Sequence, residues 1–363
     1  MKAKVLPFFS IVILLSMLLS ACSGQQVASW PGITSGTDTT YVSYLQLYSI
    51  RSSDGSLQWK YPDKTEGAGV FASPAVGTDI VVVGDYSDTL HFVDPKTGVL
   101  IKKFGDAKSK FIAPALITDK WVLAPSADHY LYALDHQANL VGKFDAGSAL
   151  WSQPLFDGKT LFQATLGHKI FAFDPANIEK PLWSSDLGGA IVSTPLLDDK
   201  GTLYVGTLAK EVVAASSTNG KIIWRTPVDQ EVWAAPVIKD NTLYIASKSG
   251  TVYALNTVDG KEIWKTSLSS GVVTSKGALT PGGVVFISVK DKNNGEADDS
   301  SDVFQLDYAT GSKTLLTTIK SLAYGDPVST PNNLLVGLTR SPDKILIALD
   351  FTGKEIWSLP VPK

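Results

Sequence analysis

Cysteine is nearly absent from this sequence of 363 residues, which contains only Cys22. A single cysteine cannot form a disulfide within the chain, so packing must stabilise the fold. Histidine is also scarce, and His91, His129, His136 and His168 lack the spacing of metal ligands. Acidic residues outnumber basic ones, 35 to 32, which excludes the positive excess typical of a nucleic-acid binder.

Apolar stripes at helical spacing are absent outside the N-terminal segment, so no buried helix is expected. Phosphate-cradling loops and nucleophile elbows require a strand, a turn and a helix in succession. No motif of this kind occurs, and no cluster of metal ligands is evident in the sequence. We therefore expect a protein that is not an enzyme and that has no cofactor and no resident metal.

The first 21 residues have the pattern of a secretory signal. Lys2 and Lys4 precede an almost unbroken apolar run over 5–19, which is short for a permanent membrane span. The run leads into Leu19-Ser20-Ala21-Cys22, which resembles the bacterial lipobox, where the cysteine receives a diacylglycerol before cleavage. Acylation of Cys22 would hold the protein on a membrane. The predicted segments are a signal peptide at 1–21, a lipidated linker at 22–29 and a repeat domain at 30–363.

Internal repetition dominates the rest of the chain. Each unit contains four short β-rich runs separated by Gly, Asp, Asn or Pro. Four strands in a period of about 40 to 45 residues are typical of a β-propeller blade. The sequence therefore predicts an all-β protein, an eight-bladed β-propeller of four-stranded antiparallel blades. The eight units are marked by one proline each, except that one proline is missing near Lys276: Pro31, Pro74, Pro114, Pro154, Pro195, Pro236 and Pro327.

A tryptophan near the end of most units has a fixed relation to a glycine. A tight turn after the third strand, such as Asp259-Gly260, is followed four residues later by an indole. We expect these indoles to dock on the seam to the next blade. The docking residues are Trp59, Trp224, Trp264 and Trp357, with Trp183 after a longer turn, whereas three blades carry Lys102, Lys143 and Leu315 instead.

The pattern Ala-Leu-Asp, Thr-Gly-Lys and Trp resembles the tryptophan-docking repeat of pyrroloquinoline quinone (PQQ) propellers, and the resemblance extends over residues 30–357. That superfamily includes PQQ-dependent dehydrogenases and non-catalytic lipoproteins of the BamB type, which assist barrel assembly in Gram-negative outer membranes. The dehydrogenases are longer and hold PQQ with a metal beside a catalytic aspartate, and no residue here matches those motifs in context. The resemblance therefore implies a fold, whereas function must be argued from a site.

The resemblance to the BamB type implies a lipid-anchored scaffold that binds other proteins outside the cytoplasm. Its partners would be the membrane, through the lipid, and proteins of an envelope assembly complex, with no nucleic acid and with the propeller itself monomeric. It would lie on the periplasmic face of the outer membrane if the cell has one, and otherwise on the outer face of the cell membrane. Two alternatives remain: a PQQ-binding dehydrogenase or cofactor carrier, and a structural component of the envelope.

Aromatic residues recur three positions before the repeat prolines, where the chain crosses from one blade to the next. Propeller topology places these crossings on the same rim as the turns between second and third strands. An exposed ring of aromatic side chains there would suit a protein interface. The alternative is that the rings plug the tops of blade seams. The candidate partner-binding residues are Phe71, Phe111, Trp151, Trp233 and Tyr324, with Val192 and Val273 at the same position in two other units.

A charged loop at 290–302 is inserted between the second and third strands of the seventh unit and projects from this same rim. Asp291, Asn293 and Gly295 loosely resemble a calcium loop. The glutamate expected at its closing position is missing, and a solvated charged loop is the alternative.

Overall fold

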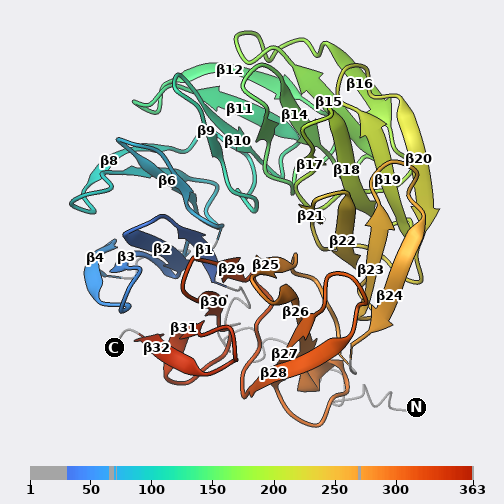
Figure 1. Ribbon diagram of the computed structural model, residues 1–363. Coiled ribbons are helices and arrows are strands. Elements are labelled where there is room, and N and C mark those ends of the chain that lie inside the picture. The colour runs from blue at the N-terminus through green and yellow to red at the C-terminus, as the bar shows by residue number, and fades with distance from the viewer. Residues whose placement is uncertain (1–30, 65–68, 71, 269–270, 362–363) are drawn as a thin grey trace, which may run out of the picture.

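The computed structural model describes residues 31–64, 69–70, 72–268 and 271–361, and within them the fold is an eight-bladed β-propeller. Each blade is a four-stranded antiparallel sheet whose strands pair in chain order. The blades follow one another around a ring, from the blue first blade to the red eighth (Figure 1). The predicted fold class and blade number are therefore confirmed.

The first four blades contain the following strands. Blade one is β1 (Gly32–Ser35), β2 (Thr39–Tyr44), β3 (Gln46–Arg51) and β4 (Leu57–Tyr61). Blade two is β5 (Ala75–Val76), β6 (Val81–Gly84), β7 (Leu90–Val93) and β8 (Leu100–Phe104). Blade three is β9 (Leu116–Ile117), β10 (Val122–Pro125), β11 (Tyr130–Leu134) and β12 (Leu140–Asp145). Blade four is β13 (Leu155–Phe156), β14 (Leu161–Ala164), β15 (Lys169–Phe173) and β16 (Trp183–Asp186).

The second four blades repeat the arrangement. Blade five is β17 (Leu196–Leu197), β18 (Thr202–Thr207), β19 (Glu211–Ser216) and β20 (Ile222–Pro227). Blade six is β21 (Val237–Lys239), β22 (Thr242–Ala246), β23 (Thr251–Asn256) and β24 (Glu262–Ser267). Blade seven is β25 (Ala278–Thr280), β26 (Gly283–Lys290), the 3-10 helix η2 (Lys292–Asn294), β27 (Ser300–Leu306) and β28 (Lys313–Ile319). Blade eight is β29 (Val328–Ser329), β30 (Leu334–Gly337), β31 (Lys344–Leu349) and β32 (Glu355–Pro360).

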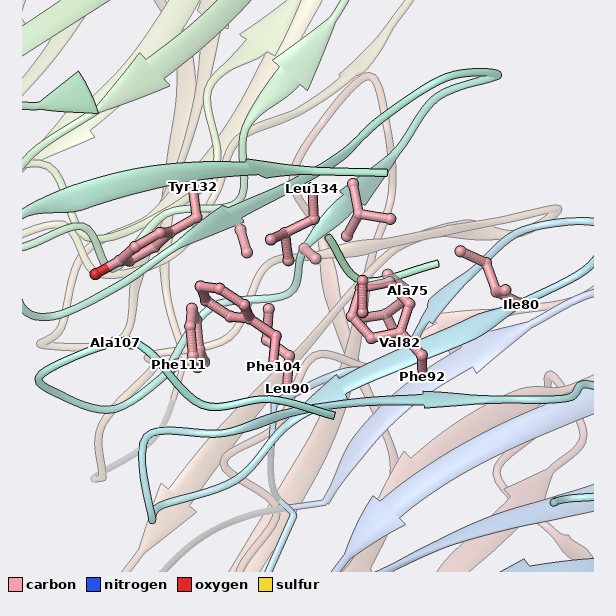
Figure 2. Close-up of a cluster of buried hydrophobic side chains, with 14 residues drawn as sticks. Ala75, Ile80, Val82, Leu90, Phe92, Phe104, Ala107, Phe111, Tyr132 and Leu134 are labelled. Atoms are coloured by element: carbon pink, nitrogen blue, oxygen red, sulfur yellow. The ribbon is translucent and has the colours of Figure 1, made fainter. Parts of the chain in front are cut away.

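The hydrophobic core lies in the seams between neighbouring blades. Phe92 and Phe104 of blade two pack with Phe111 and Tyr132 of blade three in one such cluster (Figure 2). The second and third strands have neighbours on both faces, and all four residues of β6 are buried. This environment explains why these strands have continuous apolar sequences instead of alternating ones.

Side-chain packing closes the ring. Blade one consists entirely of N-terminal strands and blade eight entirely of C-terminal strands, so no blade is completed by a strand from the other end of the chain. Val42 and Ile50 of blade one share a buried cluster with Leu335 and Leu346 of blade eight. Trp357 of blade eight lies against Gly55 of blade one, so the indole contact also spans the closure.

Indoles of five blades dock on a glycine turn of the next blade. A Cβ built on Gly260 would lie 2.5 Å from Cε3 of Trp224, and the positive φ of +70° at this glycine also disfavours a side chain. Trp224 Nε1 donates a hydrogen bond to the Thr257 carbonyl at 3.0 Å. The same contact places Trp59 on Gly98, Trp183 on Gly220, Trp264 on Gly311 and Trp357 on Gly55.

The docking positions of two blades that lack this tryptophan differ from the predicted ones, in blade three by strand pairing and in blade seven by the contact with the next blade. Trp224 pairs with Ala214, and the equivalent pair in blade three is Gly142 with Ala133, so Gly142 and not Lys143 occupies the position. In blade seven Leu315 is 51% exposed. Its neighbour Leu316 lies against the turn of blade eight, with its carbonyl oxygen 2.5 Å from a Cβ built on Gly353. Lys102 stands at the docking position of blade two, opposite Phe92.

Candidate protein-binding face

One face of the propeller, here called the crossover face, contains the segments that join successive blades and the turns between second and third strands. The four segments that join blades three to seven in succession are each hydrogen-bonded to turns of both blades that they connect. Val232 N donates to Thr207 O at 3.1 Å, and Glu231 O accepts from Lys248 N at 2.8 Å. Corresponding bonds hold Leu150 to Ser126. The backbone of this face is therefore bridged from blade to blade, which makes it a rigid platform.

Two tryptophans lie at equivalent places on the crossover face. Trp151 and Trp233 are each half-buried. The Nε1 atom of each is buried and has no hydrogen-bond partner among the described residues, so the exposed part of the indole is apolar ring. Lys248 Nζ lies 5.7 Å from the centroid of the Trp233 ring, within the range of a cation–π contact. The two rings thus present apolar surface, and that of Trp233 lies beside a cation.

Tyr324 occupies the same place in blade eight. The bond from Thr339 N to Leu322 O, 2.7 Å, matches the bond from Lys248 N to Glu231 O, so Tyr324 and Trp233 each follow two residues after the bonded carbonyl. The Tyr324 hydroxyl donates to Asp291 Oδ2 at 2.9 Å. Burial and the Asp291 carboxylate both raise the pKa of this phenol, which stays protonated and keeps donating.

The same hydrogen bonds show that the predicted rim position is wrong by one residue in blades three and seven. Ala127 N bonds to Lys110 O, so the rim residue of blade three is Ile112, and Phe111 is only 1% exposed in the seam. Val289 N bonds to Val272 O, so Thr274 stands at the rim of blade seven, and Val273 is fully buried. A slip of one residue exchanges the two faces of an extended segment. Ile112, Thr274 and Val192 are half-buried, whereas Phe71 lies outside the described residues.

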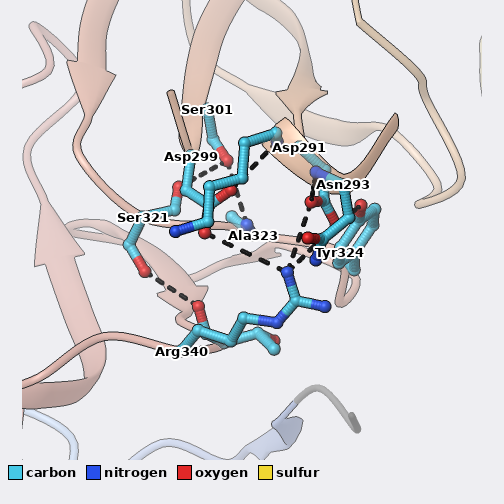
Figure 3. Close-up of polar contacts among 10 residues, drawn as sticks. Asp291, Asn293, Asp299, Ser301, Ser321, Ala323, Tyr324 and Arg340 are labelled. Atoms are coloured by element: carbon cyan, nitrogen blue, oxygen red, sulfur yellow. Dashed lines mark hydrogen bonds and ion pairs between the residues drawn. The ribbon is translucent and has the colours of Figure 1, made fainter. Parts of the chain in front are cut away.

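The insertion at 290–302 is fastened to blade eight by an arginine (Figure 3). Asp291 is 5% exposed, and both of its oxygens accept from Arg340 Nη1, at 3.2 and 3.3 Å. Its carboxylate also accepts from Asn293 N at 2.8 Å and from Tyr324. Asp299 Oδ2 lies 4.0 Å from the same guanidinium nitrogen. Arg340 therefore connects the insertion to the rim beside Tyr324.

The electrostatics of this cluster favour a charged Asp291. Burial alone would raise its pKa, but the hydrogen bonds from Asn293 and Tyr324 and the charge of Arg340 outweigh burial and hold the pKa below its ordinary value. Arg340 thus supplies the positive charge that the calcium-loop interpretation of Asp291 and Asn293 would assign to a cation. In the part of the chain that the structure describes, no three His, Cys, Asp or Glu side chains are grouped to hold a metal ion.

The histidines have structural contacts. His129 and His168 occupy equivalent turns with positive φ, 78° and 68°. His91 lies within β7, where its ring nitrogens contact Tyr61 Oη at 2.9 Å and Asp85 Oδ2 at 2.8 Å. His91 is therefore buried in the seam between blades one and two, close to the turn that precedes β7.

The fold and its docked indoles define the class: an eight-bladed propeller built from PQQ-like tryptophan-docking repeats. Residues 127–247 and 209–363 match the family model described as outer membrane protein assembly factor BamB. Together these ranges cover more than half of the chain, and the chain belongs to this family.

Solved structures show the same fold. The crystal structure of BamB from Moraxella catarrhalis is similar at 17% identity and a TM-score of 0.68, over 84% of this chain and 90% of that one. The computationally designed Ika8 protein is similar at 16% identity and a TM-score of 0.69, over 93% of this chain and 98% of that one. No curated protein matches the sequence. Among the described residues no helix is long and apolar enough to cross a membrane.

Proposed function

We propose that this protein is a non-enzymatic, lipid-anchored scaffold that binds another protein through its crossover face outside the cytoplasm. The observation that carries the proposal is the set of half-exposed side chains held on one rigid rim: Ile112, Trp151, Val192, Trp233 and Tyr324. Aromatic residues are enriched at protein interfaces, where large rings in rigid surroundings contribute most of the binding energy.

Membership in the family of an outer membrane assembly factor supports this proposal over catalysis. The partner would then be a protein of an envelope assembly complex, and the lipid on Cys22 would hold the propeller next to it. Cys22 and the signal at 1–21 lie outside the described residues, so the anchor rests on the sequence.

Site-specific photocrosslinking in cells tests which face binds. Benzoylphenylalanine at Ile112 places the probe on the rim, whereas the same probe at Ile223 places it on the outer strand β20, where the side chain is 51% exposed. We expect a discrete protein adduct from position 112 and none from position 223. Equal adducts from both positions, or adducts only from position 223, would contradict binding through the crossover face.

Replacing Cys22 by serine tests the anchor. Serine lacks the thiol to which the diacylglycerol is joined, so we expect Cys22→Ser to accumulate as an unprocessed precursor that takes up no labelled palmitate. Replacing Ser20 by alanine leaves the acceptor thiol in place and should label normally. Normal labelling of Cys22→Ser would remove the lipoprotein claim.

A further inference from the structure

The seam between blades three and four has no tryptophan at the docking position of its outer strand, although Trp121, from the turn before β10, lines the seam. In five other seams the outer strand supplies a tryptophan that packs on the turn of the next blade. Here the outer strand supplies Gly142, which pairs with Ala133 as Trp224 pairs with Ala214. A groove of about 220 Å³ lies at this place, lined by Trp121, Ala133, Gly142, Pro175, Ile178 and Glu179 among others.

The groove has room for a ring beside Gly142. A Cβ built on Gly142 comes no closer than 3.8 Å to any atom outside its chain neighbours, the nearest being Glu179 Oε1. The equivalent position in five of the other seams is filled by the docked indole. The exposed side chain of Val141 continues the apolar surface at the edge of the groove. The space that a docked indole fills in five other seams is therefore open to solvent in this seam.

The turn of blade four that borders this groove has a backbone carbonyl at the position where other blades accept the N–H of a docked indole. In blade two, Asp94 Oδ1 accepts from Lys96 N at 2.9 Å, and the intervening Pro95 carbonyl accepts the indole N–H of Trp59 at 3.0 Å. In blade four, Asp174 Oδ1 accepts from Ala176 N at 2.9 Å, so Pro175 has the corresponding place at the start of a longer loop.

Two further turns show the same acceptor. Thr257 and Tyr308 are the corresponding residues of blades six and seven, and their carbonyls accept from Trp224 and Trp264 at 3.0 Å each. Among the hydrogen bonds between described residues, none ends on the carbonyl of Pro175. The groove therefore offers an indole both an apolar slot and an acceptor for its N–H.

One charged residue, Glu179, lines the groove. Glu179 is exposed, and no ion pair between described residues includes it. A cation next to an incoming ring would therefore meet a complementary charge at the mouth of the groove.

We propose that this groove binds the side chain of a tryptophan in a second protein, with a basic residue next to that tryptophan in its sequence. The partner would supply in trans the indole that five other blades supply in cis. The site lies on the outer side of blades three and four and does not depend on binding through the crossover face.

Short peptides test the proposal on the full-length protein. Acetyl-Trp-Arg-amide should shift the indole N–H resonance of Trp121 saturably, whereas acetyl-Ala-Arg-amide should not. Gly142→Trp supplies the missing indole in cis and should weaken peptide binding at least about tenfold while raising the melting temperature. Ile263→Trp, which adds an exposed indole on the outer strand of blade six, should bind the peptide like the wild type.

A charge reversal gives an independent measurement if Gly142→Trp fails to fold. Glu179 is exposed, so Glu179→Lys should fold normally and should reverse the preference between acetyl-Trp-Arg-amide and acetyl-Trp-Glu-amide. The proposal is overturned if the wild type shows no saturable shift with the tryptophan peptide. It is equally overturned if a folded Gly142→Trp variant binds the peptide unchanged, or if Glu179→Lys leaves the preference as it was.

Discussion

Replacing Trp224 by alanine is expected to lower the free energy of unfolding by about 3 to 5 kcal/mol, the usual cost of removing a large buried aromatic side chain. The indole is 8% exposed, lies against Gly260 and donates to the Thr257 carbonyl. Its removal opens the seam between blades five and six and takes away one of the two donors to that carbonyl, leaving the Tyr204 hydroxyl at 3.2 Å. Chemical denaturation of the purified variant measures the loss.

Ile223 provides a matched control on the same strand. It precedes Trp224 in β20, but its side chain is 51% exposed. Ile223→Ala should change the free energy of unfolding by no more than about 0.5 kcal/mol, as is usual for surface substitutions. If Trp224→Ala were no less stable than this control, the docked indole would not stabilise the seam.

The fold could be predicted from the sequence because each blade repeats the same local pattern. Asp259-Gly260 and Trp264 illustrate the pattern, since the turn and the indole belong to one hairpin and their spacing is set by strand pairing. Because the pattern recurs in eight units, the predicted fold does not depend on the assignment of any single short strand. The closure of the ring was not predictable, because it depends on contacts between blade one and blade eight, such as Ile50 with Leu346.

The rim position was predicted with an error of one residue in two blades because the proline was used as a fixed marker. In blade four, β13 begins directly after Pro154, but in blade three β9 begins two residues after Pro114. The proline is replaced in blade seven, where Gly277 and not Lys276 directly precedes β25. Because side chains alternate between the two faces of an extended segment, an error of one residue exchanges the buried and the exposed positions.

The docking position of blade three was predicted at Lys143, and not at Gly142, for a related reason. The turn of that blade places Ala138, with a φ of 58°, where other blades have glycine, and the docking position follows four residues later at Gly142. Lys143 instead extends over the ring of Tyr130, with Nζ 4.5 Å from the ring centroid. Neither glycine nor tryptophan stands at its usual place in this blade. The sequence alone therefore does not indicate which residue of the outer strand faces the seam.

The contact between Asp291 and Arg340 was not predictable for a different reason. The two residues are 49 positions apart and belong to different blades, so no local pattern connects them. Within the loop, Asp291 resembles a cation ligand because its carboxylate does face a positive charge, that of the Arg340 guanidinium. The structure supplies that charge from the turn of blade eight.

Replacing both Trp151 and Trp233 by alanine is expected to reduce the photocrosslinked adduct formed through position 112 at least about tenfold. Truncation of a central aromatic residue at an interface commonly costs about 2 kcal/mol or more, and about 1.4 kcal/mol corresponds to a factor of ten in affinity. Both indoles expose apolar ring on the crossover face, whereas their N–H groups are buried and unpaired. Quantified adduct yield in cells measures the effect.

Phenylalanine at the same two positions separates binding from packing. It retains an aromatic ring and removes an N–H group that has no partner, so Trp151→Phe with Trp233→Phe should keep both the fold and most of the adduct. The alanine pair should remain folded, with a lower melting temperature because each ring is half-buried. If the alanine pair melts early yet gives the full adduct below its melting temperature, the two rings fill the blade seams and the binding surface lies elsewhere on the propeller.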